Sequence, residues 1–322
     1  ATAHPAKFPE VVEPLLGRTW VRIIDVALLF VMLALGLNIV VGFAGLLDLG
    51  YVAFFAVGAY LYALLASPHF GLHWPFFLLL PMGAALACLF GVLLGAPTLR
   101  LRGDYLAIVT LGFGEIIRIF LNNLDHPFNI TNGPKGVNQI DPVRFLGINL
   151  GKPLNIGGFE VASVSLYYYL FLVLVLVTVF VCQRLQDSRV GRAWMAIRED
   201  EIAAKAMGLN VRNLKLLAFG MGATFGGMSG VLFESFQRFV SPESFSLMES
   251  VMVVAMVVLG GLGHIPGVIL GALVLAGLPE VLRHVAGPLT EATGGRLGPE
   301  ILRQLLIALA MVVVMLLRPK GL

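Results

Sequence analysis

Positions Arg184–Lys215 read RLQDSRVGRAWMAIREDEIAAKAMGLNVRNLK, and they form the only sizeable polar segment in the second half of the chain. Two long apolar runs flank this segment, which carries seven basic and four acidic residues. Basic loops between membrane spans lie on the cytoplasmic side of the membrane. We therefore expect residues 184–213 to form a cytoplasmic loop that divides a membrane-embedded chain into two parts.

Small and apolar residues alternate with the charges inside this loop. We expect one short helix here, which Gly191 begins and Gly208 ends. A helix with one charged face and one apolar face suits docking to a cytoplasmic partner. The alternative is a solvated connector that only follows the orientation rule.

The composition indicates an all-α polytopic membrane protein. Hydrophobic residues make up 58% of the chain and charged residues only 13%, which is far more apolar than a soluble domain. Apolar runs of about 20 residues recur, the length that crosses the hydrocarbon core of a lipid bilayer. The net charge of +3 is concentrated in a few loops, so it reports orientation and not nucleic-acid binding.

We expect about eight transmembrane helices in this chain. Residues 1–18 contain three prolines and are expected to be an irregular lead-in, whereas residues 19–322 form a single transmembrane domain. Residues 122–163 are the longest polar connection between spans. The expected spans lie at about 19–41, from a break near 42–50 through about 66, and at about 75–96, 104–121, 164–182, 214–236, 268–286 and 300–317.

Two glycine-rich breaks interrupt the apolar pattern, VVGFAGLLDLG at Val40–Gly50 and VVLGGLGHIPG at Val257–Gly267. Paired breaks in two halves of a membrane protein predict a repeat with a pathway between the halves. The alternative is a short loop between two ordinary spans. Within the span at 104–121, Glu115 is an ionisable residue and therefore a functional candidate. The alternative is that it forms a structural pair with Arg118. The candidate pathway residues are Gly42, Gly45, Asp48, Gly50, Glu115, Gly260, Gly261 and Gly263.

The polar segment also predicts the orientation of the other loops. Counting spans from it, with the apolar run Glu249–Leu259 before the second break included, places Arg100, Arg102, Arg318 and Lys320 in the cytoplasm. The same count places residues 122–163 and 237–248 outside, together with the start of the first span. If the native N-terminus is cytoplasmic, at least one more span precedes this sequence.

The sequence contains no pattern that predicts catalysis. It lacks a GxxxxGK[ST] phosphate loop, an HExxH or GxSxG motif and a CxxC pair. We therefore expect no enzyme activity, no metal and no cofactor in this chain. Few charges are expected within the spans, which disfavours an ion-coupled carrier. A membrane path with a cytoplasmic docking loop indicates a transport subunit that another protein drives.

Several stretches resemble a known family. Gly191–Leu209, with EIAAKAMG, is similar to the coupling loop of ABC-importer permeases, in which a Glu-Ala-Ala…Gly pattern is usual. Asp48 departs from the family, where an uncharged residue is usual. Four stretches and the tail RPKGL resemble LivM-type permeases of branched-chain amino acid ABC importers: Gly42–Tyr60, Leu99–Phe120, Phe239–Phe245 and Val257–Gly267.

The resemblance implies a multi-subunit importer in the bacterial inner membrane. This chain would pair with a homologous LivH-type permease, two cytoplasmic ATPase subunits that hold ATP and Mg²⁺, and a periplasmic amino-acid-binding protein. Its substrates would be leucine, isoleucine and valine. The alternatives are the same architecture for urea, an amide or a sugar, and an ion-coupled secondary carrier. The residues implied to couple to the ATPases are Gly191, Arg192, Trp194, Ile197, Arg198, Glu199, Glu201, Ala203, Ala204 and Gly208.

Overall fold

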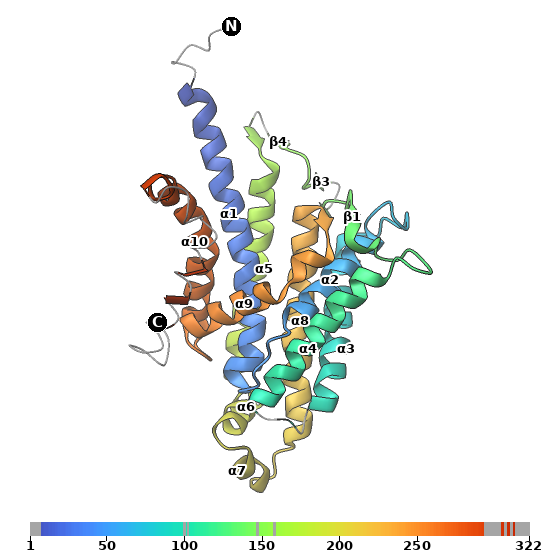
Figure 1. Ribbon diagram of the computed structural model, residues 1–322, viewed down its shortest axis with the longest axis vertical. Helices are drawn as coiled ribbons and strands as arrows, with labels where there is room; N and C mark the ends of the chain where they lie inside the picture. Colours follow the sequence, from blue (N-terminus) through green and yellow to red (C-terminus); the bar gives the residue numbers. More distant parts are fainter. Residues whose placement is uncertain are drawn as a thin grey trace.

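A computed structural model describes residues 8–98, 101, 103–145, 148–156 and 159–292, together with positions 304, 305, 308, 309 and 312. Long helices dominate these residues, and short β-hairpins lie at one end of the helical body (Figure 1). The helices are α1 Phe8–Asn38, α2 Val52–Leu65, α3 Phe76–Thr98, α4 Asp104–Asn123, α5 Ser163–Gln186, α6 Arg189–Glu199, α7 Glu201–Ala206, α8 Val211–Gln237, α9 Leu247–Gly260 and α10 Ile265–Ala292.

Five helices in the described residues are long and apolar enough to cross a membrane: Thr19–Phe43, Phe76–Thr98, Tyr105–Asn123, Ser163–Gln186 and Val211–Gln237. Three further apolar helices are shorter, Val52–Leu65, Leu247–Gly260 and Ile265–Pro279. A 14-residue helix such as α2 is about 21 Å long, which is less than the hydrocarbon thickness of about 30 Å. By length, the described residues therefore do not confirm the expected number of about eight spans.

Helices α1 and α8 form the centre of the body. α8 packs along both α2 and α3, and α1 contacts α5, α8, α9 and α10. The face of α8 between these helices consists largely of glycine, alanine and serine, so the helix backbones approach closely. In contrast, α3, α4 and α5 leave many large apolar side chains exposed, as expected for helices that face lipid.

Both glycine-rich breaks are present. The first consists of the π-helical turn Ile39–Phe43 and an irregular stretch that ends where α2 begins at Val52. The second separates α9 from α10, and Pro266 falls in the first turn of α10. Proline is tolerated there, because backbone N–H groups in the first turn make no hydrogen bond within the helix.

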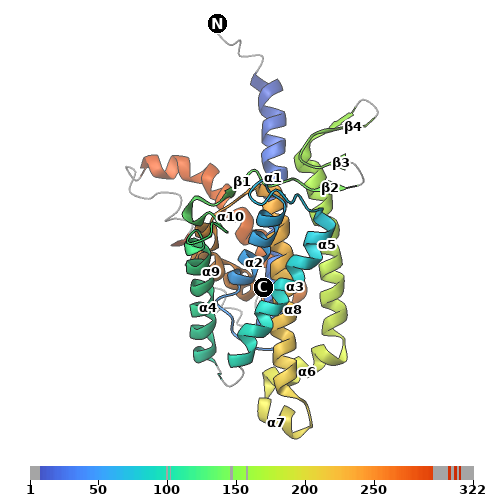
Figure 2. The same cartoon turned by 90° about the vertical axis from the view of Figure 1, so that its right-hand side faces the viewer.

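Residues 122–163 fold back onto the helical body and are not an open loop. Two hairpins pair β2 Arg144–Phe145 with β3 Ile148–Asn149, and β4 Leu154–Ile156 with β5 Phe159–Val161. β1 Val137–Asn138 pairs with β6 Phe239–Val240, which joins this segment to the connection after α8. These strands lie at the end of the body opposite to α6 and α7 (Figure 2).

One expectation about the N-terminal segment was wrong. α1 begins at Phe8, so residues 8–18 are helical and not irregular. Pro9 falls in the first turn of α1, where proline is tolerated. The expected last span at about 300–317 lies almost entirely outside the described residues. Arg100, Arg102, Arg318 and Lys320 also lie outside the described residues.

Candidate coupling site

The polar segment forms two short helices and not the single helix that the sequence predicts. α6 begins at Arg189, because the Ser188 hydroxyl accepts a hydrogen bond from the Gly191 N–H. α6 ends where Asp200 adopts an extended conformation. The Asp200 carboxylate then accepts hydrogen bonds from the N–H groups of Ile202 and Ala203, which begins α7. Gly208 follows α7 with a φ of +84°, as expected for a helix stop.

The apolar face of α6 packs against the protein's own helices. Trp194 is fully buried, and its indole Nε1 donates a 2.7 Å hydrogen bond to the Leu214 carbonyl oxygen on α8. Ile197 and Ala204 are buried in a small cluster with Val211. These three predicted ATPase contacts, Trp194, Ile197 and Ala204, are thus positioned to hold α6 and α7 against α8.

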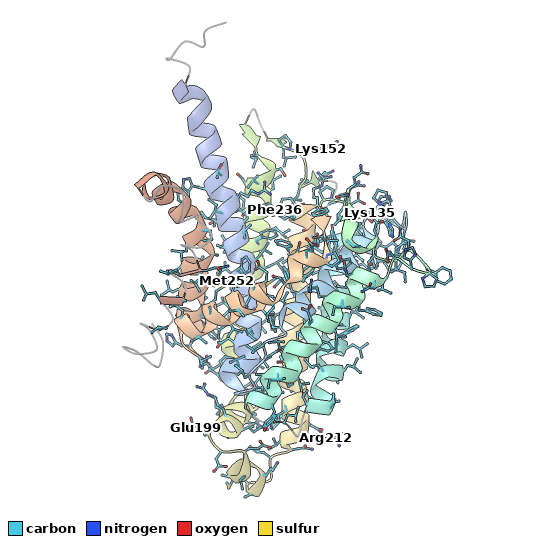
Figure 3. The ribbon with its side chains drawn as sticks, viewed as in Figure 1. Lys135, Lys152, Glu199, Arg212, Phe236 and Met252 are labelled. Atoms are coloured by element: carbon cyan, nitrogen blue, oxygen red, sulfur yellow. The ribbon has the colours of Figure 1, made fainter. Side chains whose placement is uncertain are left out.

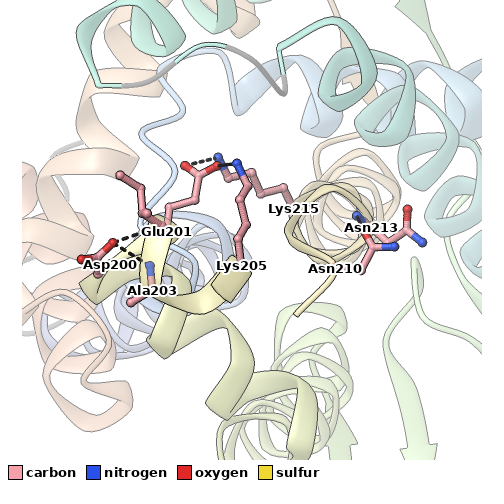
Figure 4. Close-up of polar contacts among 8 residues, drawn as sticks. Asp200, Glu201, Ala203, Lys205, Asn210, Asn213 and Lys215 are labelled. Carbon is pink, nitrogen blue, oxygen red and sulfur yellow. Dashed lines mark hydrogen bonds and ion pairs between the residues drawn. The ribbon is translucent and has the colours of Figure 1, made fainter. Parts of the chain in front are cut away.

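Glu201 also faces its own chain. Its Oε2 lies 3.0 Å from Lys215 Nζ on α8, and its Oε1 lies 2.9 Å from Lys205 Nζ on α7 (Figure 4). The Lys215 side chain is 6% exposed and the Glu201 side chain is 16% exposed, whereas Lys205 is 55% exposed. The geometry therefore makes Glu201 a residue that fixes α7 on α8, which differs from the direct docking contact implied by the sequence.

The outward surface of α7 is apolar at two positions. Ile202 is 69% exposed and Met207 is 84% exposed, and Ala203 and Gly208 beside them are exposed too. Charged residues next to them in the chain, Glu199, Asp200 and Lys205, are exposed as well. Neither Ile202 nor Met207 is among the residues that the resemblance implied for coupling, and the sequence analysis expected one helix where the structure has two.

Arg198 joins α6 to both glycine-rich breaks. Its guanidinium Nη1 donates a hydrogen bond to the carbonyl oxygen of Gly42, and Gly45 packs against the same side chain. The Gly263 N–H donates a 2.9 Å hydrogen bond to Asn38 Oδ1. Because a Cβ atom on Gly263 would lie 3.2 Å from Arg198 Nη1, the second break also lies beside the guanidinium.

The remaining candidate pathway residues do not join this cluster. Gly50 packs against the α4 backbone at Thr110, and Asp48 Oδ1 accepts a 2.9 Å hydrogen bond from the Gly50 N–H. Glu115 pairs with Arg118 and lines a cavity of about 120 Å³ between α2, α4 and α9. Gly260 packs against Gly267, and Gly261 has a φ of +96° at the start of the turn.

The helical body contains more buried carboxyl groups than the sequence suggested. Three carboxylic acid side chains are fully buried: Asp25 on α1, Asp48 in the first break and Glu234 on α8. Neither Asp25 nor Glu234 has a hydrogen-bond partner for its carboxylate among the described residues. Of these three, the sequence analysis named only Asp48. It missed Asp25 and Glu234, because a single carboxylate within a long apolar run leaves the run apolar on average.

The chain is similar to permease components of amino-acid transporters. Residues 19–315 match the family described as branched-chain amino acid transport system / permease component. The high-affinity branched-chain amino acid transport system permease protein LivM of Escherichia coli K12 is 42% identical, over 96% of this chain and 71% of its own length. The same protein from Salmonella typhimurium LT2 is 42% identical over the same shares of the two chains.

More distant matches describe the same kind of protein. The probable branched-chain amino acid transport permease protein LivM of Methanocaldococcus jannaschii is 25% identical over 76% of this chain and 68% of its own length. The permease protein LivH of Escherichia coli K12 is 37% identical over 30% of each chain. No solved structure matches the chain. The family match covers most of the sequence and includes both breaks and the α6–α7 segment, so the chain belongs to the permease-component family of branched-chain amino acid transport systems.

Proposed function

We propose that this chain is a transmembrane permease subunit of an ATP-driven importer that moves leucine, isoleucine and valine across the bacterial inner membrane. Its similarity to LivM permeases over nearly the whole chain supports this function. The five long apolar helices support a multi-pass membrane location. The sequence contains no phosphate-binding loop, so the ATP would be bound by separate subunits.

The proposed importer contains four kinds of subunit. This chain pairs with a LivH-type permease, to which it is related in sequence, and with two cytoplasmic ATPase subunits and a periplasmic binding protein. α6 and α7 lie in the cytoplasm, and the hairpins of residues 122–163 lie in the periplasm. Together with the short helices α2, α9 and α10, the five long helices would cross the membrane about eight times.

The observation that carries this proposal is the arrangement of α6 and α7. Their outward surface presents Ile202 and Met207 among charged side chains, which matches the apolar centre and polar rim of a protein interface. Arg198 of α6 donates a hydrogen bond to the first break and lies beside the second. A motor that binds the outer surface would therefore act on the helix breaks through one side chain.

Binding of the ATPase subunits tests the docking surface. We expect Met207→Asp to weaken their binding to the permease pair by at least about tenfold, because an unpaired charge would be buried in the interface. Met207→Leu keeps an apolar side chain of similar size and should bind normally. Affinity is measured with the purified permease pair in nanodiscs. Equal binding of the Asp and Leu variants would refute the docking role of α7.

The buried carboxylates give one reason to test an ion-coupled carrier as well, because such groups relay protons in secondary transporters. Uptake of leucine is measured in liposomes with the complete importer and with the permease pair alone. The proposed function predicts uptake only with the ATPases and ATP. Uptake by the permease pair alone, driven by an ion gradient, would contradict it.

A further inference from the structure

A cavity of about 580 Å³ lies between the end of α3, the start of α8 and the helix α7. Its walls include Ala96 and Pro97 of α3, Lys205 of α7, and Arg212 and Lys215 of α8. Arg212 and Glu199 of α6, both labelled in Figure 3, lie at the same end of the helical body. The proposed function places this end in the cytoplasm, so the cavity would lie at the inner surface of the bilayer. Its volume falls within the range of about 300–1,000 Å³ that small-molecule sites occupy.

The described lining residues carry three cationic side chains and one carboxylate, so their net charge is +2. Lys205 and Lys215 share the Glu201 carboxylate, at 2.9 Å and 3.0 Å (Figure 4). An ammonium group has three N–H donors, so each lysine can bind a further anion while its ion pair with Glu201 stays intact. Arg212 is exposed and adds a planar guanidinium, which suits the oxygen atoms of a phosphate. The charges of this cavity therefore favour an anionic ligand.

An apolar strip on the outside of α3 leads to the same cavity. Leu89, Val92 and Leu93 are exposed large apolar residues. They lie on one face of the helix together with Ala96, because residues three and four positions apart are neighbours on a helix surface. The strip spans about 10 Å from Leu89 to Ala96. Hydrocarbon contacts and phosphate contacts thus adjoin each other at the end of α3.

We propose that this cavity binds the phosphate group of an anionic phospholipid from the inner leaflet, whose acyl chains lie along the α3 strip. Lys205, Arg212 and Lys215 would face the phosphate. Basic pockets between transmembrane helices on the cytoplasmic side bind such head groups. The cytoplasmic location of the cavity rests on the function proposed above. A lipid bound here would contact α3, α7 and α8 together, and would therefore help to hold α7 in place.

The experiment counts lipids bound to the complete importer by native mass spectrometry, with the detergent-purified complex titrated with phosphatidylglycerol. We expect Arg212→Gln to weaken the binding of phosphatidylglycerol by at least about tenfold, because it removes a charged hydrogen-bond donor. Arg189→Gln is the matched control, because Arg189 is likewise an exposed arginine in the first turn of a helix, α6. It does not line the cavity, so this variant should bind the lipid as the wild type does.

The two arginine variants separate ligand binding from the orientation rule alone. If the cations only follow the rule that places basic residues in the cytoplasm, both variants will bind phosphatidylglycerol equally, and this result would overturn the proposal. Lys205→Gln is a second test, because Lys205 is 55% exposed and its replacement leaves the ion pair between Glu201 and Lys215 in place. It should weaken the binding of phosphatidylglycerol as well.

Two further probes distinguish a lipid from a free phosphate. Phosphatidylcholine with the same acyl chains has no net charge and should bind at least about tenfold more weakly than phosphatidylglycerol. Inorganic phosphate has no acyl chain for the α3 strip, so about a tenfold excess of it should not displace the lipid. Equal binding of the two lipids, or displacement by inorganic phosphate, would overturn the proposal. An importer that takes up no leucine would instead refute the proposed function and leave these lipid affinities unchanged, so the two failures are distinguishable.

Discussion

The ion pair between Glu201 and Lys215 should hold α7 in place more strongly than the ion pair between Glu201 and Lys205. Lys215 Nζ lies 3.0 Å from Glu201 Oε2 with a side chain only 6% exposed, whereas Lys205 Nζ lies 2.9 Å from Oε1 with a side chain 55% exposed. Breaking a buried pair by removing one partner costs about 3–5 kcal/mol, and an exposed pair contributes about 0–1 kcal/mol. Since Glu201 keeps Lys205 in the Lys215→Ala variant, we expect the lower end, about 3 kcal/mol.

Amide hydrogen exchange of residues 202–206 measures this difference in the purified protein. Exchange through local opening of α7 should accelerate by about two orders of magnitude in Lys215→Ala, because 1.4 kcal/mol corresponds to a factor of ten. Lys205→Ala should accelerate it by less than about fivefold. A double variant, Glu201→Gln with Lys215→Met, should exchange more slowly than Lys215→Ala alone, because no unpaired charge stays buried.

The Lys215→Ala and Lys205→Ala variants should therefore not exchange at the same rate. Equal rates would mean that solvent screens both pairs alike, and that the burial of Lys215 does not fix α7. In that case Glu201 would be available to a partner, as the resemblance to other importer permeases implied.

Two further predictions concern the breaks. Gly50→Ala should destabilise the protein by about 1–3 kcal/mol, because a Cβ atom would overlap the Thr110 carbonyl oxygen on α4. Gly112→Ala is the control: Gly112 also lies on α4, but no atom lies near its added Cβ, so this variant should be neutral or slightly stabilising. Thermal unfolding in detergent compares the two variants. Arg198→Ala should leave the ATPase subunits bound but lower leucine uptake per ATP hydrolysed, because α6 loses its contact with Gly42; unchanged coupling would show that the force passes elsewhere.

Apolar length was enough to locate most long helices from the sequence. The expected span at 104–121 corresponds to α4 Asp104–Asn123, and the span at 75–96 corresponds to α3 Phe76–Thr98. Both helices expose many apolar side chains, so their extent follows from the requirement that lipid-facing backbone be helical. The two breaks were also predictable, because clustered glycines weaken a helix locally.

The coupling site depends on contacts that composition cannot predict. Asp200 is acceptable within a helix and strongly favoured as an N-cap, and only the packed structure selects the second use. The partner of Glu201 lies 14 residues away on another helix, and the carbonyl that Arg198 contacts is 156 residues away. Such pairings follow from how α1, α6 and α8 meet, so the types of residue were predictable while their roles were not.

The contact between Arg198 and Gly42 has about the strength that a coupling element needs. A hydrogen bond from a charged group contributes about 1.5–3 kcal/mol, and coupling free energies between distant sites are typically about 1–3 kcal/mol. Arg198 lies on the helix α6, whereas the backbone that it faces belongs to the two breaks. A displacement of α6 would therefore be absorbed at the breaks and not within the long helices. The loss of this single side chain should thus reduce the coupling of transport to ATP hydrolysis and leave ATPase affinity unchanged.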